Sequence, residues 1–273
     1  MSKNLNPMQI YQLLNQSNCR ECGEPTCMAF AASVFKGHKQ LSACPYVDKE
    51  TLNKYSDLEP ARTGTEENMQ QAMHYLQQKI PETDLAEAAR RTGGIFENQK
   101  LTLQIMGKNF SVDTKGGLDS EIHVNPWVSI PVLQYILHGK GKEPTGNWAP
   151  FKELPHGRPR AGLFEQRCEK PLKRVADNYP DLFYDILDLF DAMEVDKGFR
   201  ADVSFLLYPL PRLPMIIAWW YPAEDLESAL HIFFDETAKD NLGVDGVFAL
   251  GTGLAMMVEK LALRHGVKGF IPL

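Results

Sequence analysis

The sequence has no excess of basic residues. Its 273 residues include 29 Lys and Arg against 35 Asp and Glu, which gives a formal net charge of −6 at pH 7. A protein that binds nucleic acid neutralises the phosphates with Lys and Arg side chains. The charge balance therefore argues against nucleic acid as a partner.

Long apolar runs are lacking too. The longest strongly apolar run is Leu213–Tyr221, and it contains Pro214. A helix that crosses a membrane needs about 20 predominantly apolar residues. The N-terminal stretch Met1–Pro7 lacks the long apolar core of a secretory signal. We therefore expect no membrane span and a cytoplasmic location.

Cysteine is scarce, but four of the five cysteines lie close together in the sequence. They are Cys19, Cys22, Cys27 and Cys44, with the spacing C-x2-C-x4-C-x16-C, and Pro45 follows the last of them. In a reducing compartment, clustered cysteines are more often metal ligands than disulfide partners. The spacing predicts that these four thiols bind a metal centre.

The identity of the metal depends on the gaps between the cysteines. Four thiolates suit both a 4Fe-4S cluster and a structural zinc ion. Zinc sites commonly use two C-x2-C pairs, whereas this sequence has one such pair, Cys19 and Cys22. We predict one 4Fe-4S cluster, and structural zinc stays as the alternative.

Helices are expected on both sides of the first three cysteines. Asn6 and Pro7 are typical of a helix start, and apolar residues at helical spacing extend that helix to about residues 15–18. Thr26 can cap a second helix from Cys27 to about residue 36, which Gly37 would end. That helix is rich in alanine and would let an inorganic cluster approach closely.

The rest of the chain predicts a second, larger domain. We place the four-cysteine domain at residues 1–48, a polar connector with one short helix at 49–65, and the second domain at 66–273. Helices are expected at about 66–79, 82–91, 126–138, 163–178, 181–193 and 244–264. Strands are expected at 100–106, 110–113, 122–124, 201–208, 215–221 and 229–234. Connections are expected at 107–109, 139–159 and 209–214, and Pro131 should delay the start of the helix at 126–138.

This order of elements does not show strict alternation of strand and helix, which argues against a doubly wound parallel sheet. It predicts an α+β protein: a small helical four-cysteine domain followed by a larger domain with a mixed or antiparallel sheet and several helices.

The second domain contains isolated residues that could serve a site. Asp235 follows a strand, where a helix cap is the more common role. His231 could face a pocket, although a single strand histidine is more often packed or on the surface. Trp219, Trp220 and Tyr221 form the densest aromatic group, in which core packing competes with a surface for a flat ligand.

Two further features favour structural roles. Cys168 has no neighbouring cysteine or patterned histidine and is interpreted as a spare thiol. Gly251-Thr252-Gly253 lies within the last helix without a preceding strand, so it does not indicate a dinucleotide site and favours close helix packing. No Ser-His-Asp, paired-carboxylate or HExxH arrangement is visible, and the sequence leaves open whether the protein is an enzyme.

The four-cysteine segment resembles a known cluster domain. Cys19-Arg-Glu-Cys-Gly-Glu-Pro-Thr-Cys-Met-Ala-Phe-Ala31, closed by Cys44-Pro-Tyr46, is similar to the N-terminal 4Fe-4S domain of the corrinoid iron-sulfur protein large subunit. It also resembles the cluster domain in the iron-sulfur subunit of Rnf-type electron-transport complexes. The similarity covers about residues 8–48 and includes all four cysteines. It implies one low-potential cluster that passes single electrons to a redox partner, which could be a protein that contains a corrinoid or a flavin.

Beyond that segment the resemblance changes. The chain lacks the Asp-x-His-x-x-Gly corrinoid signature and the later ferredoxin-like cysteine runs of the Rnf subunit. Residues from about 66 to 265 resemble an uncharacterised domain of anaerobic bacteria and archaea that has no known activity. The matching stretches are Leu133–His138, Trp148–Lys152, Ala201–Ser204, Pro211–Pro214, Trp219–Trp220 and Phe233–Thr237.

Two functions are compatible with these observations. The first is a single-electron transfer module that acts with an unidentified partner. The alternative is a non-catalytic binding protein, or a redox or oxygen sensor, whose cluster is structural or responsive.

Overall fold

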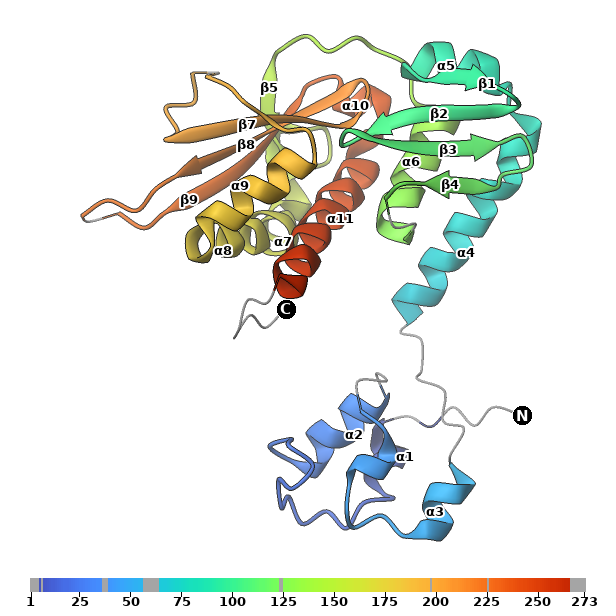
Figure 1. Ribbon diagram of the computed structural model, residues 1–273, viewed down its shortest axis with the longest axis vertical. Helices are drawn as coiled ribbons and strands as arrows, with labels where there is room; N and C mark the ends of the chain where they lie inside the picture. The colour runs from blue at the N-terminus through green and yellow to red at the C-terminus, as the bar shows by residue number, and fades with distance from the viewer. Residues whose placement is uncertain are drawn as a thin grey trace. The chain divides into compact units, whose positions relative to one another are not determined.

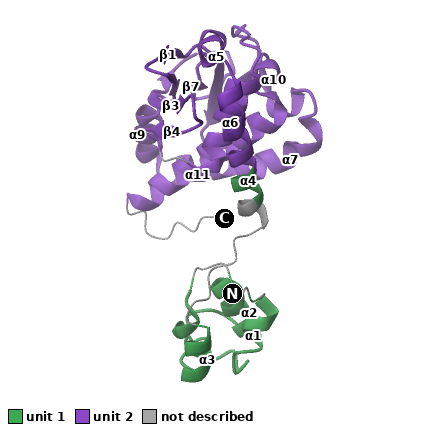
Figure 2. Ribbon diagram, turned by 90° about the vertical axis from the view of Figure 1, so that its right-hand side faces the viewer, with its two compact units in different colours: residues 1–71 green, residues 72–273 purple. Residues whose placement is uncertain are grey.

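The chain divides into two compact units in a computed structural model (Figure 2). The units are Met1–Gln71 and Ala72–Leu273. The structure describes residues 5, 7–35, 39–55, 64–122, 125–196, 198–224 and 226–265. The domain limits inferred from the sequence (1–48, 49–65 and 66–273) stay a prediction.

The first unit consists of short helices joined by turns. Its helices are α1 (Pro7–Tyr11), α2 (Cys27–Phe35) and α3 (Lys49–Lys54), with a 3₁₀ turn at Leu41–Ala43 between the last two. The predicted cap of α2 is confirmed, because the hydroxyl oxygen of Thr26 accepts the N–H of Ala29 at 3.0 Å. Asp48 caps α3 in the same way through the N–H of Thr51, at 2.8 Å.

The prediction for α1 was wrong in length. The helix ends at Tyr11, and Leu13 and Leu14 continue in a turn with hydrogen bonds to the carbonyls three residues back. Left-handed backbone at Gln16 then stops any helical continuation. The expected cap Asn6 and the expected end of α2 at residues 36 and 37 lie outside the described residues.

The core of the first unit is small. Its buried residues come from all parts of the unit and include two of the four clustered cysteines. They are Ile10, Leu14, Cys27, Phe30, Ala31, Val34, Leu41, Cys44 and Val47. A core of this size supports a fold weakly, and small domains commonly add a metal centre to it.

The second unit opens with helices and an antiparallel sheet. Helix α4 (Gly64–Lys79), which contains the division between the units, leads through a 3₁₀ turn to α5 (Leu85–Thr92), and Gly93 ends α5 in left-handed conformation. The sheet has the order β1-β2-β3-β4. Its strands are β1 (Ile95–Glu97), β2 (Lys100–Ile105), β3 (Lys108–Asp113) and β4 (Leu118–Ser120).

The β2–β3 hairpin was predicted, but its turn lies one residue earlier than expected. Met106 and Gly107 both have positive φ, at 48° and 70°, as a tight two-residue hairpin turn requires. The strand expected at 122–124 was misplaced: β4 precedes it, Ile122 lies in a bend, and residues 123 and 124 are outside the described chain.

A second antiparallel sheet forms the larger part of this unit. Its order is β5-β9-β8-β7-β6. The strands are β5 (Trp148–Pro150), β6 (Met193–Glu194), β7 (Val203–Leu210), β8 (Leu213–Trp220) and β9 (Ala229–Asp235). The α+β class and the antiparallel alternative are thereby confirmed.

Helices gather on one face of this second sheet (Figure 1). The ring of Phe183 in α9 meets Trp219 of β8 at 5.9 Å, and the ring of Phe164 in α7 meets Phe234 of β9 at 6.0 Å. The helices on this side are α7 (Ala161–Phe164), α8 (Lys170–Asn178), α9 (Pro180–Leu189) and α11 (Gly243–Arg264). Helix α6 (Pro126–His138) packs against α5 and α11, and α10 (Ala238–Asn241) leads into α11. A π-helical turn, Glu165–Glu169, joins α7 to α8.

Two expectations about proline were wrong. Helix α6 begins at Pro126 under the side-chain cap of Asn125 and runs through Pro131 without delay. Pro209 lies inside β7 and Pro214 inside β8, so the connection is shorter than the expected 209–214 and consists of Pro211 and Arg212. A bulge between residues 207 and 210 shifts the register of the two strands there.

Helix α11 passes through the core, and two of its glycines lie where neighbouring elements approach it closely. A Cβ atom on Gly251 would lie 2.9 Å from the ring of Phe164, and a Cβ atom on Gly253 would lie 2.9 Å from the carbonyl oxygen of Trp127. The close-packing interpretation of these glycines is confirmed.

Helix α11 also qualifies the expectation of no membrane span. Within the described part of the chain, it is the one helix whose length and composition would let it cross a membrane. It contains no long uninterrupted apolar run, because polar residues interrupt its sequence. Of its most apolar 18-residue stretch, 56% is buried in the unit. Core helices of globular proteins often have the same length and apolar composition.

Candidate metal centre

The four clustered cysteines all belong to the first unit, and each has a free thiol. Cys27 is the first residue of α2, and Cys44 directly follows the 3₁₀ turn. Both are buried, Cys22 is half-buried and Cys19 is exposed. The thiols therefore run from the small core of the unit to its surface.

The loop that carries the first two cysteines has an unusual backbone. Asn18, Arg20 and Gly23 have φ values of 51°, 65° and 79°, so left-handed residues stand on both sides of Cys19. Alternation between left-handed and ordinary backbone turns successive N–H groups toward one side and forms a concave site for anions, a device used around iron-sulfur clusters. In this loop the N–H of Asn18 donates to a cysteine sulfur.

Asn18 joins the first cysteine segment to the third cysteine. Its backbone N–H donates to the sulfur of Cys27 at 3.3 Å, and its side-chain oxygen accepts the N–H of Cys27 at 2.8 Å. An N–H donor stabilises thiolate charge, and so does a position at the start of a helix. Cys27 has both.

Two contacts link the segments that carry the other cysteines. The ammonium of Lys39 donates to the carbonyl of Cys22 at 2.6 Å and pairs with Glu24 at 3.2 Å. The hydroxyl of Tyr46 donates to Glu21 at 2.7 Å.

The hydrogen bond between Tyr46 and Glu21 also acts on the phenol. It raises the pKa of Tyr46, because the carboxylate stabilises the protonated hydroxyl.

The donor set fits an iron-sulfur cluster. Among the described residues, no three His, Cys, Asp or Glu side chains stand close enough to hold one metal ion. Four thiolates suit a tetrahedral zinc ion as well as a 4Fe-4S cluster, in which each cysteine binds a different iron. Four free thiols and an N–H donor to Cys27 suit the cluster, and the assignment of the four ligands stays a prediction.

Asp235 of the second unit has a structural role. Asp235 is fully buried and accepts the N–H groups of Thr145, Gly146 and Thr237, at 2.9, 2.6 and 3.0 Å. These hydrogen bonds hold the loop before β5 against the end of β9. The prediction that Asp235 caps a helix was wrong: the cap position of α10 lies two residues later, at Thr237.

The aromatic group is divided between core and surface. Trp219 is buried and donates its indole N–H to Asp177, at 3.2 Å. The indole of Trp220 donates to the carbonyl of Arg200 at 2.9 Å, and the hydroxyl of exposed Tyr221 lies 2.9 Å from that of Tyr184. Core packing thus accounts for the first ring.

Cys168 is also part of the core. It is fully buried, and burial raises the pKa of its thiol to about 12. A thiol that stays protonated at neutral pH is a poor nucleophile and a poor metal ligand. The interpretation of Cys168 as a spare thiol agrees with this environment.

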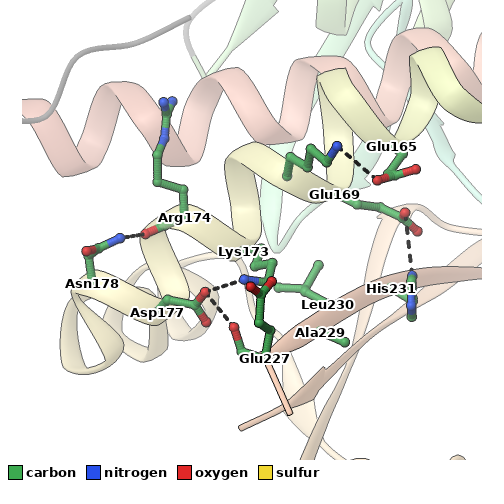
Figure 3. Close-up of a pocket in the computed structure, with 12 residues that line it drawn as sticks. Glu165, Glu169, Lys173, Arg174, Asp177, Asn178, Glu227, Ala229, Leu230 and His231 are labelled. Atoms are coloured by element: carbon green, nitrogen blue, oxygen red, sulfur yellow. Dashed lines mark hydrogen bonds and ion pairs between the residues drawn. The ribbon is translucent and has the colours of Figure 1, made fainter. Parts of the chain in front are cut away.

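The second unit contains a cleft that the sequence did not reveal. It has a volume of about 540 Å³ and lies between the helical stretch Glu165–Asn178 and the segment Glu227–His231 (Figure 3). Of its lining, the sequence pointed only to His231. The polar residues of the helical wall recur at three- and four-residue intervals, which is also the pattern of a solvated helix face.

His231 is held by a carboxylate at one end of the cleft. Its Nδ1 atom lies 3.5 Å from Glu169, whose other oxygen accepts the backbone N–H of Ile232 at 3.0 Å. The side chain of Glu169 is 13% exposed, so it is largely shielded from water. The hydrogen bond to Glu169 raises the pKa of His231.

Replacement of Glu169 by glutamine is expected to lower the pKa of His231. The negative charge favours the imidazolium form, whereas a glutamine oxygen can still accept the N–H of Ile232. NMR titration of the His231 ring protons measures the shift, and Glu165→Gln serves as the control with a smaller effect. The ion pair between Glu169 and protonated His231 adds to the free energy of unfolding below pH about 6.5. That addition is lost as the pH rises through the pKa of His231 in the folded protein. An unchanged or higher pKa in Glu169→Gln would contradict the pairing.

Comparison with known proteins separates the two parts of the chain. A family model described as "Putative Fe-S cluster" matches residues 14–46, and one described as "Domain of unknown function (DUF3786)" matches residues 84–257. The second match covers more than half of the chain.

Curated relatives match the N-terminal part of the chain. The corrinoid/iron-sulfur protein large subunit of Moorella thermoacetica is 49% identical over 43 residues, which is 16% of this chain and 10% of that protein. Acetyl-CoA decarbonylase/synthase complex subunit gamma 1 of Methanosarcina thermophila is 50% identical over 44 residues, 16% of this chain and 9% of that protein. The chain thus matches about a tenth of the length of these relatives. No solved structure matches it.

These matches confirm two of the resemblances drawn from the sequence, and the resemblance to the Rnf-type subunit stays a prediction. The four-cysteine segment is similar to the corrinoid iron-sulfur protein, and the larger part of the chain is similar to a domain whose activity is not established. Iron-sulfur binding is thereby supported for the first unit.

Proposed function

Because this chain belongs to the DUF3786 family and carries an iron-sulfur segment ahead of that domain, we propose that it is a single-electron transfer protein with one 4Fe-4S cluster. The ligands would be Cys19, Cys22, Cys27 and Cys44. The observation that carries the proposal is the presence of all four free thiols in one small unit, within the segment that matches the iron-sulfur model.

The surrounding residues are suited to hold such a cluster. When bound, a 4Fe-4S cluster accepts and releases one electron at a time. The N–H of Asn18 and the helix start at Cys27 stabilise thiolate charge, and the ammonium of Lys39 adds positive charge beside Cys22. Buried Phe30 and Val34 of α2 keep water from the inner side of the site.

A protein partner follows from the same proposal. An electron-transfer module needs a donor or an acceptor, and the relatives include subunits of the acetyl-CoA decarbonylase/synthase complex. For this chain we propose a cytoplasmic redox partner, with a corrinoid- or flavin-containing protein as the first candidate. The exposed thiol of Cys19 marks the side of the unit from which an electron would leave.

Metal analysis under anaerobic conditions tests the proposal directly. We expect about four iron atoms and four sulfide ions per chain, and an EPR signal after reduction with dithionite that is absent before it. Stoichiometric zinc without iron would contradict an iron-sulfur function and favour the structural zinc site. A cluster that cannot be reduced unless the protein unfolds would contradict electron transfer but not iron-sulfur binding.

The exposure of Cys19 also favours a second candidate function, oxygen or redox sensing. An accessible ligand gives oxidants a route to a cluster. Air exposure that removes the cluster and changes the fold or the association state of the protein would favour a sensor. Repeated reduction and oxidation without cluster loss would favour electron transfer.

A further inference from the structure

An ion pair lies against the loop that carries the second cysteine. The ammonium of Lys39 pairs with Glu24 at 3.2 Å and donates to the carbonyl oxygen of Cys22 at 2.6 Å. The side chains of Lys39 and Glu24 are 30% and 22% exposed, so water covers only a minor part of each. Charges that are partly shielded from water act more strongly on their neighbours than charges on an open surface.

The backbone and a hydroxyl group hold this ion pair in place. The backbone N–H of Lys39 donates to the carbonyl of Ser33 at 3.3 Å, and the hydroxyl of Ser33 donates at 3.0 Å to the same oxygen of Glu24 that faces Lys39. A Cβ atom on Gly23, whose φ is 79°, would lie 3.3 Å from the ammonium nitrogen. The ammonium is therefore packed against the turn that follows Cys22.

The charges of the pair are close enough to act on the metal centre. The carbonyl oxygen and the sulfur of one cysteine are four bonds apart, which is at most about 5 Å. The ammonium of Lys39 therefore lies within about 8 Å of the sulfur of Cys22, a distance close to the Debye length at physiological ionic strength. A positive charge at this distance favours the reduced form of a cluster, which carries one more electron, and a negative charge opposes it.

We propose that Lys39 and Glu24 set the reduction potential of the cluster through opposing charges. The inference rests on the proposed function, in which the four cysteines hold a 4Fe-4S cluster. Lys39 raises the potential, and Glu24 lowers it and, with Ser33, positions the ammonium beside Cys22. Both are positioning residues and neither binds iron.

An EPR-monitored redox titration of the full-length protein under anaerobic conditions tests this assignment. Lys39→Met should shift the midpoint potential to more negative values, because the carboxylate of Glu24 is left without its partner charge. Glu24→Gln should shift it to more positive values. At the midpoint potential of the wild type, each change should alter the ratio of reduced to oxidised cluster about fivefold. The double variant should return close to the wild-type potential.

Control variants separate charge from structure. Lys39→Arg keeps the positive charge and should restore most of the wild-type potential, whereas Ser33→Ala keeps both charges and should shift it little. Lys54→Met removes an exposed lysine of α3 in the same unit and should have a smaller effect than Lys39→Met. Glutamine has the shape of glutamate and still accepts from Ser33, so Glu24→Gln should retain the iron and the circular dichroism of the wild type.

The signs of the two shifts decide the proposal. Shifts of the same sign, no shift in either variant, or an equal shift in Lys54→Met would overturn it, because a structural disturbance or the net charge would then explain the data. If Lys39→Met loses its cluster, a potential of Glu24→Gln at or below that of the wild type overturns it. A wild-type protein without a reducible cluster would contradict the proposed function itself, and this inference with it.

Discussion

Serine at Cys27 or at Cys44 is expected to reduce the iron content from about four atoms per chain to three or fewer and to weaken the visible absorption of the cluster. A hydroxyl group is a harder and less acidic ligand than a thiol, so it is a poor replacement for a thiolate on iron. Both positions are buried in the small core of the first unit. Loss of the cluster should therefore also lower the thermal stability of that unit, because the core alone is too small to compensate.

The fifth cysteine provides a matched control for this experiment. Cys168 is buried in the second unit, where its sulfur lies 3.6 Å from the hydroxyl of Thr252. Cys168→Ser should retain the full complement of iron and the EPR signal. If Cys27→Ser and Cys44→Ser kept all the iron, or if Cys168→Ser lost as much as they do, the ligand assignment would be wrong.

Alanine at Gly253 is expected to destabilise the second unit by about 1–2 kcal/mol. The added Cβ atom would stand 2.9 Å from the carbonyl oxygen and 3.2 Å from the carbonyl carbon of Trp127. Both are backbone atoms of α6, so a change of side-chain rotamer cannot relieve the contact. Overpacking of this kind costs about 1–3 kcal/mol, and the better helix propensity of alanine offsets part of that cost.

Gly162 in α7 provides the control for Gly253. A Cβ atom there meets no atom within 4 Å, and the residue lies within a helix. Gly162→Ala should leave stability unchanged or raise it by up to about 1 kcal/mol. Chemical denaturation followed by tryptophan fluorescence measures both variants. Equal stability of Gly253→Ala and Gly162→Ala would show that α6 and α11 can separate without a cost.

The sequence predicted the elements whose pattern is long enough to be read locally. Helix α6 (Pro126–His138), strand β9 (Ala229–Asp235) and helix α11 (Gly243–Arg264) have the types and nearly the limits expected. Strands β1, β4, β5 and β6 have two or three residues each and were not identified in place. Such short segments have no visible alternation, and their conformation depends on the neighbouring strand with which they pair.

The candidate sites show the same limit. The cysteine motif lies within 26 residues, so its chemistry is visible in the spacing alone. The bond between Tyr46 and Glu21, and the approach of Lys39 to Cys22, depend on how the unit folds back on itself. The cleft was hidden for a further reason: Glu169 and the backbone of Ile232 are 63 residues apart, and only tertiary packing joins them.

The position of α11 along the chain has a consequence for synthesis of the protein. The helix is translated after all the strands and the other helices of the second unit, yet α6 and α8 pack against it. At typical translation rates its 22 residues take roughly 1–4 s to appear. During that interval the apolar sides of α6 and α8 that pack against this helix are uncovered, and a stop codon introduced before residue 243 should yield insoluble material.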